Sequence, residues 1–227
     1  MQPIPPLPSL EELVQQLGDL AGMPAVITAC ACAVLVVVLR DWRGLLAAFM
    51  AMQLALAVLT SLFLPPVWSL LNVIVGGLMA IMWYLSAQRA GWGGRFLPFR
   101  STSGVQSRPL SSTTLFRAVA ALTLAGALLA ARPRLPLPPT PPDVRVVATW
   151  LAAYSLLGLA LGDEALQAGA ALGIWLAATQ LVVGALNPDP WLIGLLAAVN
   201  LLIGLGTAYL MVARGPAMSQ SPGEEGE

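Results

Sequence analysis

Seven apolar stretches, each long enough to cross a lipid bilayer, make up most of this chain. The hydrocarbon core of a bilayer is about 30 Å thick and takes about 20 residues of helix. Because no water is available there, the backbone must satisfy its own hydrogen bonds, which favours helices. Helices are predicted over 22–39, 44–64, 67–87, 114–131, 146–162, 166–186 and 191–213. The predicted fold class is therefore an all-α integral membrane protein with seven transmembrane helices, arranged four plus three.

Composition supports a membrane protein and narrows its chemistry. The chain is 58% hydrophobic and only 10% charged, whereas soluble domains carry about 25% charged residues. It contains no His and no Lys, and its net charge is zero, which argues against nucleic-acid binding. Cys30 and Cys32 are too few to complete a metal site without His. We expect no catalytic residue, no metal and no cofactor of the protein's own, so an enzyme acting alone is not expected. Bound lipid is expected, and a quinone or pigment is left open.

Polar and proline-rich segments divide the chain. A stretch from Ser9 has the pattern of a short amphipathic helix at the membrane surface, with acids in its first turn. Prolines in the second long connection favour an extended, semi-rigid strap. The predicted parts are an N-terminal tail with interfacial helix (1–21), a four-helix membrane part (22–131) with a polar loop (88–113), the strap (132–145), a three-helix membrane part (146–214) and a flexible tail (215–227).

The distribution of arginine predicts the orientation. With helices crossing alternately, one side carries eight arginines and the other three. The richer side has Arg40, Arg43, Arg89, Arg95, Arg100, Arg108, Arg117 and Arg214, and the poorer side has Arg132, Arg134 and Arg145. Cytoplasmic connections carry the excess of positive charge. The N-terminus is therefore predicted outside and the C-terminus inside, in the inner (cytoplasmic) membrane.

Ionisable groups within a membrane usually mark function, and none lies at a predicted midplane here. Asp163 and Glu164 occupy the turn between the fifth and sixth predicted helices. We expect Asp163 to cap the following helix, and a proton-entry carboxylate is the alternative.

The deep polar residues are neutral amides: Gln53, Asn72, Gln180 and Asn200. Amides hydrogen-bond across helix interfaces in membranes, so their predicted role is interhelical. The alternative is the lining of a hydrated cavity. None of them can carry a proton.

Small and basic residues suggest contact surfaces. Gly158 with Gly162 and Gly169 with Gly173 have the i,i+4 spacing that lets helices approach closely, so these four glycines are candidate helix-packing residues. Arg89, Arg95, Arg100 and Arg108 alternate with aromatic residues in the polar loop. Such a segment either lies on anionic lipid headgroups or docks a neighbouring subunit.

The order of elements resembles the hydrogenase-4 component E family, membrane subunits of formate-hydrogenlyase-type complexes. The last three helices are similar to subunit K of respiratory complex I. Local similarities are Ser86-Ala-Gln-Arg89, Leu156-Leu-Gly-Leu159, Gly173 with Val182-Val-Gly-Ala-Leu186, and Ala213-Arg214. The resemblance covers roughly residues 20–214 and implies a subunit that packs against antiporter-like membrane proteins.

The chain departs from that family at its membrane charges. Where the resemblance places a Glu in the sixth helix, this chain has Leu176 to Gln180, and the acidic position of the seventh helix falls near Asn200. A basic position in the third helix falls near Gly76. The resemblance thus implies a degenerate member that does not relay protons.

Three functions follow from these patterns. The first is a non-catalytic accessory subunit of a complex-I-like or hydrogenase-like ion-translocating assembly. The second is a stand-alone transporter of a small molecule or ion, with a neutral polar pathway. The third is a small subunit of another energy-transducing membrane complex, with a pigment or quinone bound between helices.

Overall fold

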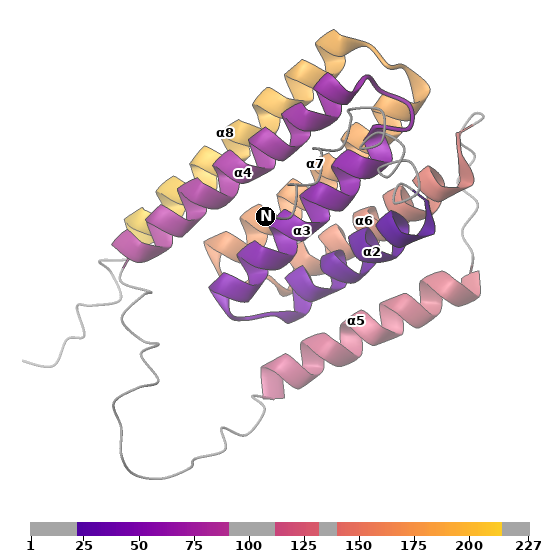
Figure 1. Ribbon diagram of the computed structural model, residues 1–227. Helices are drawn as coiled ribbons and strands as arrows, with labels where there is room; N and C mark the ends of the chain where they lie inside the picture. Colours follow the sequence, from indigo (N-terminus) through magenta and orange to yellow (C-terminus); the bar gives the residue numbers. More distant parts are fainter. Residues whose placement is uncertain (1–21, 91–111, 132–139, 215–227) are drawn as a thin grey trace, which may run out of the picture.

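A computed structural model describes residues 22–90, 112–131 and 140–214. These residues form helices and no strand (Figure 1). The helices are α2 (Met23–Val38), α3 (Trp42–Thr60), α4 (Pro66–Arg89), α5 (Ser112–Ala131), α6 (Pro142–Leu161), α7 (Ala165–Leu186) and α8 (Pro190–Arg214). Six of them, α3 to α8, are long and apolar enough to cross a membrane. The helix α2 is apolar but has 16 residues, which gives a length of about 24 Å.

Prolines account for most helix starts and for the main differences from the predicted boundaries. Helix α6 begins at Pro142, four residues before the predicted start and inside the predicted strap. Proline is favoured in the first turn because that position needs no backbone donor, and Asp143 complements the helix dipole there. Helix α3 ends at Thr60 rather than 64. One further turn follows, in which the Leu64 amide donates to the Thr60 carbonyl at 2.9 Å.

The helices pack as two rows of three. The first row contains α2, α3 and α4 in that order, and the second contains α6, α7 and α8. Across the rows, α2 packs against α6, α3 against α7, and α4 against α8; Figure 1 shows the last pair lying along each other. The four helices α3, α4, α7 and α8 therefore form a bundle of their own, with α3 and α7 in the middle of the rows and α4 and α8 at one edge.

Facing helices of the two rows run in the same direction. Val37, near the end of α2, meets Gly158, near the end of α6. At the other edge of the rows, the Trp83 indole Nε1 of α4 donates to the Gly204 carbonyl of α8 at 3.0 Å, late in both helices. The second row is thus related to the first by a sideways displacement. A two-fold rotation about the membrane normal would instead place α2 opposite α8.

The contacts between the rows place large side chains of the first row against glycines of the second. A Cβ built on Gly173 would lie 3.0 Å from Phe49 Cε2, and one on Gly204 would lie 2.7 Å from Met79 Cγ. At Gly184 it would lie 3.1 Å from Leu64 Cδ1. Such close approach of helix backbones is a common way for helices to associate in membranes.

Helix α5 lies outside the two rows and contacts only α2 and α6 closely (Figure 1). Polar contacts at two positions, Arg117 and Ala121, hold it. The Tyr154 hydroxyl of α6 donates to the Ala121 carbonyl at 2.6 Å, and the Arg117 guanidinium donates to the Leu161 carbonyl at the end of α6. Of residues 114–131, only 11% are buried.

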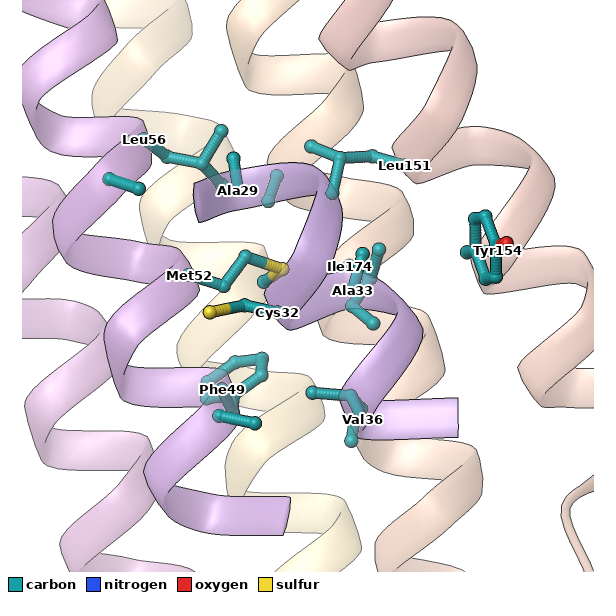
Figure 2. Packing of buried hydrophobic residues seen from close by; sticks show 14 of the residues in the cluster. Ala29, Cys32, Ala33, Val36, Phe49, Met52, Leu56, Leu151, Tyr154 and Ile174 are labelled. Carbon is teal, nitrogen blue, oxygen red and sulfur yellow. The ribbon is translucent and has the colours of Figure 1, made fainter. Parts of the chain in front are cut away.

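An apolar core lies between α2, α3, α6 and α7, on the side of the rows away from α4 and α8. Figure 2 shows Met52 of α3 pointing toward α2, where Cys32 lies next to it. Both cysteines are free. The labelled core residues are Ala29, Cys32, Ala33, Val36, Phe49, Met52, Leu56, Leu151, Tyr154 and Ile174.

Candidate functional site

Buried hydroxyl groups and buried amides behave differently inside this bundle. The hydroxyls of Thr60, Ser155 and Thr207 each donate to a carbonyl three or four residues earlier in their own helix, a common way of satisfying a hydroxyl. Eight buried side-chain nitrogen or oxygen atoms in the described residues have no hydrogen-bond partner. Four of these belong to the predicted interhelical amides.

We call these four residues, Gln53, Asn72, Gln180 and Asn200, the amide cluster. Each is at most 8% exposed. Each comes from a different helix of the four-helix bundle: α3, α4, α7 and α8, respectively. The unpartnered atoms are the Nε2 atoms of the two glutamines and the Oδ1 atoms of the two asparagines.

Contacts between the helices fix the depth of each amide. Gly76 of α4 faces Gln53 of α3, since a Cβ on Gly76 would lie 2.8 Å from Gln53 Cγ. The two residues are therefore at the same depth. Asn72 lies on the same face of α4, four residues earlier, which is about 6 Å along the helix.

The depth of Asn200 follows from the neighbouring pair of helices. Gly204 of α8 lies against Met79 of α4, and α4 and α8 run in the same direction. Asn200 precedes Gly204 by four residues, and Gly76 precedes Met79 by three. The two steps differ by about 1.5 Å, so Asn200 lies at the depth of Gly76 and therefore of Gln53.

Gln180 is placed by the pair α3 and α7. Gly173 of α7 lies against Phe49 of α3, and Gln180 follows Gly173 by seven residues while Gln53 follows Phe49 by four. Gln180 therefore lies about 4–5 Å beyond Gln53, on the same side as Asn72. All four amides fall within about one helical turn.

All four residues also lie on inward faces. Residues three, four or seven apart share a helix face, and Asn72 shares its face with Gly76 and Met79, which contact α3 and α8. Gln180 likewise shares its face with Gly173, and Asn200 with Gly204. The sequence interpretation named these residues one by one, and the structure places them at similar depth on the inward faces of four packed helices.

One end of the amide cluster is closed by large side chains. Phe49 and Trp83 pack with ring centroids 5.1 Å apart, and Phe49, Met79 and Trp83 are fully buried. The sequence interpretation took Trp83, at the end of the third predicted helix, as an aromatic anchor at the membrane interface, whereas the structure buries it fully. It did not single out Met79. A long apolar residue two turns from an asparagine on the same helix face is the signal that would have found Met79.

The cluster can hydrogen-bond but cannot exchange protons or hold an ion by charge. Amides do not titrate and offer both donors and acceptors. In the described residues no group of three or more His, Cys, Asp or Glu is placed to hold a metal. Leaving a buried donor or acceptor unsatisfied costs about 1–3 kcal/mol, so the cluster's own atoms favour a hydrogen-bonding occupant.

The structure places the glycines within the chain's own packing. Gly158 faces Ala171 of α7 at 3.0 Å from a built Cβ, Gly169 faces Thr207 of α8, and Gly173 faces Phe49. Gly162 follows the last residue of α6 and does not lie on a helix face. Contact of these glycines with another subunit stays a prediction.

The predicted docking arginines fall mostly outside the described residues. Arg89 is the last residue of α4 and is exposed. Arg95, Arg100 and Arg108 lie outside the described ranges, as do the predicted interfacial helix and most of the predicted strap.

The prediction that Asp163 caps the next helix is wrong. The N-cap of α7 is Glu164, and it makes no side-chain cap hydrogen bond. Asp163 Oδ2 instead lies 3.3 Å from Nη2 of Arg117, whose side chain is 4% exposed. The buried guanidinium attracts the carboxylate of the nearby turn, because a charge with few solvent contacts needs a partner.

Comparison with protein-family models, with curated proteins and with solved structures found no match to this chain. The resemblance to hydrogenase-4 component E is therefore carried only by the order of elements and the short similarities quoted above.

Proposed function

We propose that the protein is a non-catalytic accessory subunit that packs against other integral membrane subunits of an ion-translocating assembly, complex-I-like or hydrogenase-like. The observation that carries the proposal is the position of α5. This helix is held to its own chain by polar contacts at Arg117 and Ala121 and along one narrow face, and the rest is open.

The open side of α5 is apolar. Phe116, Leu122 and Leu129 are 60%, 78% and 67% exposed. Lipid covers such residues well, but a helix kept beside its bundle rather than within it also leaves room for a neighbouring helix on either side. A subunit that bridges two neighbours needs such an element.

The helices that the structure describes hold no Asp, Glu, Lys or His deep in the bundle, which supports a non-catalytic role. Membrane proteins that relay protons use Asp, Glu, Lys or His within the membrane. The buried polar residues of α3, α4, α7 and α8 are amides and hydroxyls. The buried Arg117 lies near the start of α5. We propose no catalytic residue and no cofactor of the protein's own.

The positions of arginines support the proposed orientation. Arg40 and Arg43 flank the start of α3, and the ring of Trp42 lies 5.5 Å from that of Tyr84 near the end of α4. Arg89 and Arg117 lie at this same end of the bundle, whereas Arg145 lies at the opposite end. Arg214, the last residue of α8, lies at the same end as Arg89. By the excess of positive charge, the end with these five arginines is proposed to be cytoplasmic, with the chain divided four helices plus three.

The test is photo-crosslinking in native membranes with purification in mild detergent. A photoreactive residue replaces Leu122, and a control replaces Leu124, which is half-buried against the core. We expect adducts with a second membrane protein from position 122 only. A protein that purifies alone, with adducts to lipid only, would contradict the accessory role.

A second candidate function is a pathway for a small uncharged solute. Two observations favour it: the amide cluster at mid-depth, and the two three-helix rows that run in parallel. Substrate sites of transporters lie near the midplane at the interface between structural repeats. Purified protein in liposomes would then accelerate the entry of urea or glycerol, and Asn200→Leu would abolish the gain. Entry at the rate of protein-free liposomes would exclude this function.

A further inference from the structure

The amide cluster needs hydrogen-bonding partners that the described residues do not provide. Its four side chains are buried, lie at depths that agree to within about one helical turn, and each has an atom without a partner. In high-resolution structures such atoms are bonded to protein or to ordered water in the large majority of cases.

We propose that the amide cluster is a binding site for a small uncharged molecule that both donates and accepts hydrogen bonds, with water as its smallest occupant. The site is enclosed by α3, α4, α7 and α8 and lies at mid-depth. The inference concerns what fills the cluster and holds under either proposed function.

The chemistry of the unpartnered atoms selects such a molecule. The glutamine Nε2 atoms donate, and the asparagine Oδ1 atoms accept. A quinone carbonyl can only accept and an ammonium ion can only donate, so either would leave half of the atoms unsatisfied. Water does both, and buried water typically makes about three hydrogen bonds to otherwise unpaired polar groups.

The surroundings exclude an ion. No described residue at the depth of the cluster carries a charge, and bringing an unpaired ion into an apolar environment is far more costly than bringing in a neutral polar group. The backbone offers no compensation, because helical carbonyls are already bonded.

The packing also limits the size of the occupant. Gly76, Gly173 and Gly204 bring the four helices together around Gln53, Phe49 and Met79, and an added Cβ at any of them would lie within 3.0 Å of one of these side chains. A large headgroup would have to separate the helices at this level. Water molecules need far less space than such a headgroup.

X-ray radiolysis in ¹⁸O-labelled water tests the site directly. Hydroxyl radicals form where water is and oxidise nearby side chains, methionine readily. Met79 lies against Gly204, one turn from Asn200. Met52 directly precedes Gln53, but its side chain points toward α2, away from α4 and α8 (Figure 2). Both are fully buried, so Met52 is a matched control. The protein is labelled in lipid nanodiscs and the methionines are analysed by mass spectrometry.

We expect ¹⁸O incorporation at Met79 and background incorporation at Met52. In Asn200→Leu and in Gln53→Leu, incorporation at Met79 should fall to the level of Met52. Equal background labelling of both methionines in the unmodified protein would overturn the proposal and indicate a dry cluster. Labelling of Met79 that survives both substitutions would also overturn it. The comparison of Met79 with Met52 needs no variant, so it stands even if one substitution prevents folding.

Discussion

Two adjacent glycines at the centre of α4 offer a sharp test of the packing around the amide cluster. Gly76 faces Gln53, where an added Cβ would lie 2.8 Å from Cγ and 3.1 Å from Cβ, while an added Cβ on Gly77 would meet nothing within 4 Å. We predict that Gly76→Ala destabilises the protein relative to Gly77→Ala. The second variant is the control for the first.

The magnitude follows from two terms. Replacing glycine by alanine within a helix gains about 1 kcal/mol of helix propensity, and the gain applies equally to both positions. Overpacking costs about 1–3 kcal/mol and applies to Gly76 alone. The atom nearest the added methyl is near the root of the Gln53 side chain, so rotation of the amide does not relieve the contact. The difference between the variants is therefore about 1–3 kcal/mol.

Thermal unfolding of the two purified variants in the same detergent measures this difference. In proteins of this length 1 kcal/mol corresponds to about 2–4 °C, so Gly76→Ala should unfold several degrees below Gly77→Ala. Equal unfolding temperatures, or a more stable Gly76→Ala, would show that α3 and α4 do not approach as described. The inference that Gln53 and Gly76 lie at the same depth would then be wrong as well.

The remaining predictions concern the contacts that hold the outer elements. Asp163→Asn should change thermal stability little, because the Asp163 side chain is 76% exposed and exposed ion pairs contribute little. Arg117→Leu should free the start of α5 and raise the rate of proteolysis in the connection before it, measured against the unmodified protein. Tyr154→Phe removes the hydrogen bond to the Ala121 carbonyl and should lower the free energy of unfolding by about 1 kcal/mol, whereas an unchanged unfolding curve would refute that bond. Trp83→Phe removes the indole donor to α8 and should lower stability more, since it also leaves space in a fully buried position.

The helices were predictable from sequence, because apolar runs and prolines act locally. Pro65 and Pro66 separate α3 from α4, and the boundaries agree to within a few residues. The exceptions depend on local geometry. Residues 61–64, predicted as the end of a helix, form a turn after α3. Helix α6 begins earlier than predicted, because its first position accepts Pro142 without needing a backbone donor.

The arrangement of the helices was not predictable in the same way. Apolar surface all around each helix does not indicate which side faces a neighbour, since lipid and protein are equally apolar. The four amides could therefore be identified as deep but not as neighbours. The sequence placed Arg117 near the interface because it is close to the start of an apolar helix, whereas the fold buries its side chain beside Leu161.

Sequence similarities between the two rows are present but short. An aspartate precedes both α3 and α7, at Asp41 and Asp163, and the pattern Pro-x-x-Trp precedes or opens both α4 and α8, at Pro65–Trp68 and Pro188–Trp191. Such short patterns occur by chance in membrane proteins, and only the packing of equivalent helices makes them meaningful.

The sideways relation between the rows makes them complementary rather than interchangeable. The first row presents Phe49, Leu64 and Met79, and the second presents the glycines that receive them. A head-to-tail contact of this kind uses a different surface on each partner, so neither row offers itself a matching surface. If the chain were divided between α5 and α6, the two fragments should recognise each other but not form like pairs. The order of the rows in the folded protein is then fixed by shape as well as by the connecting chain.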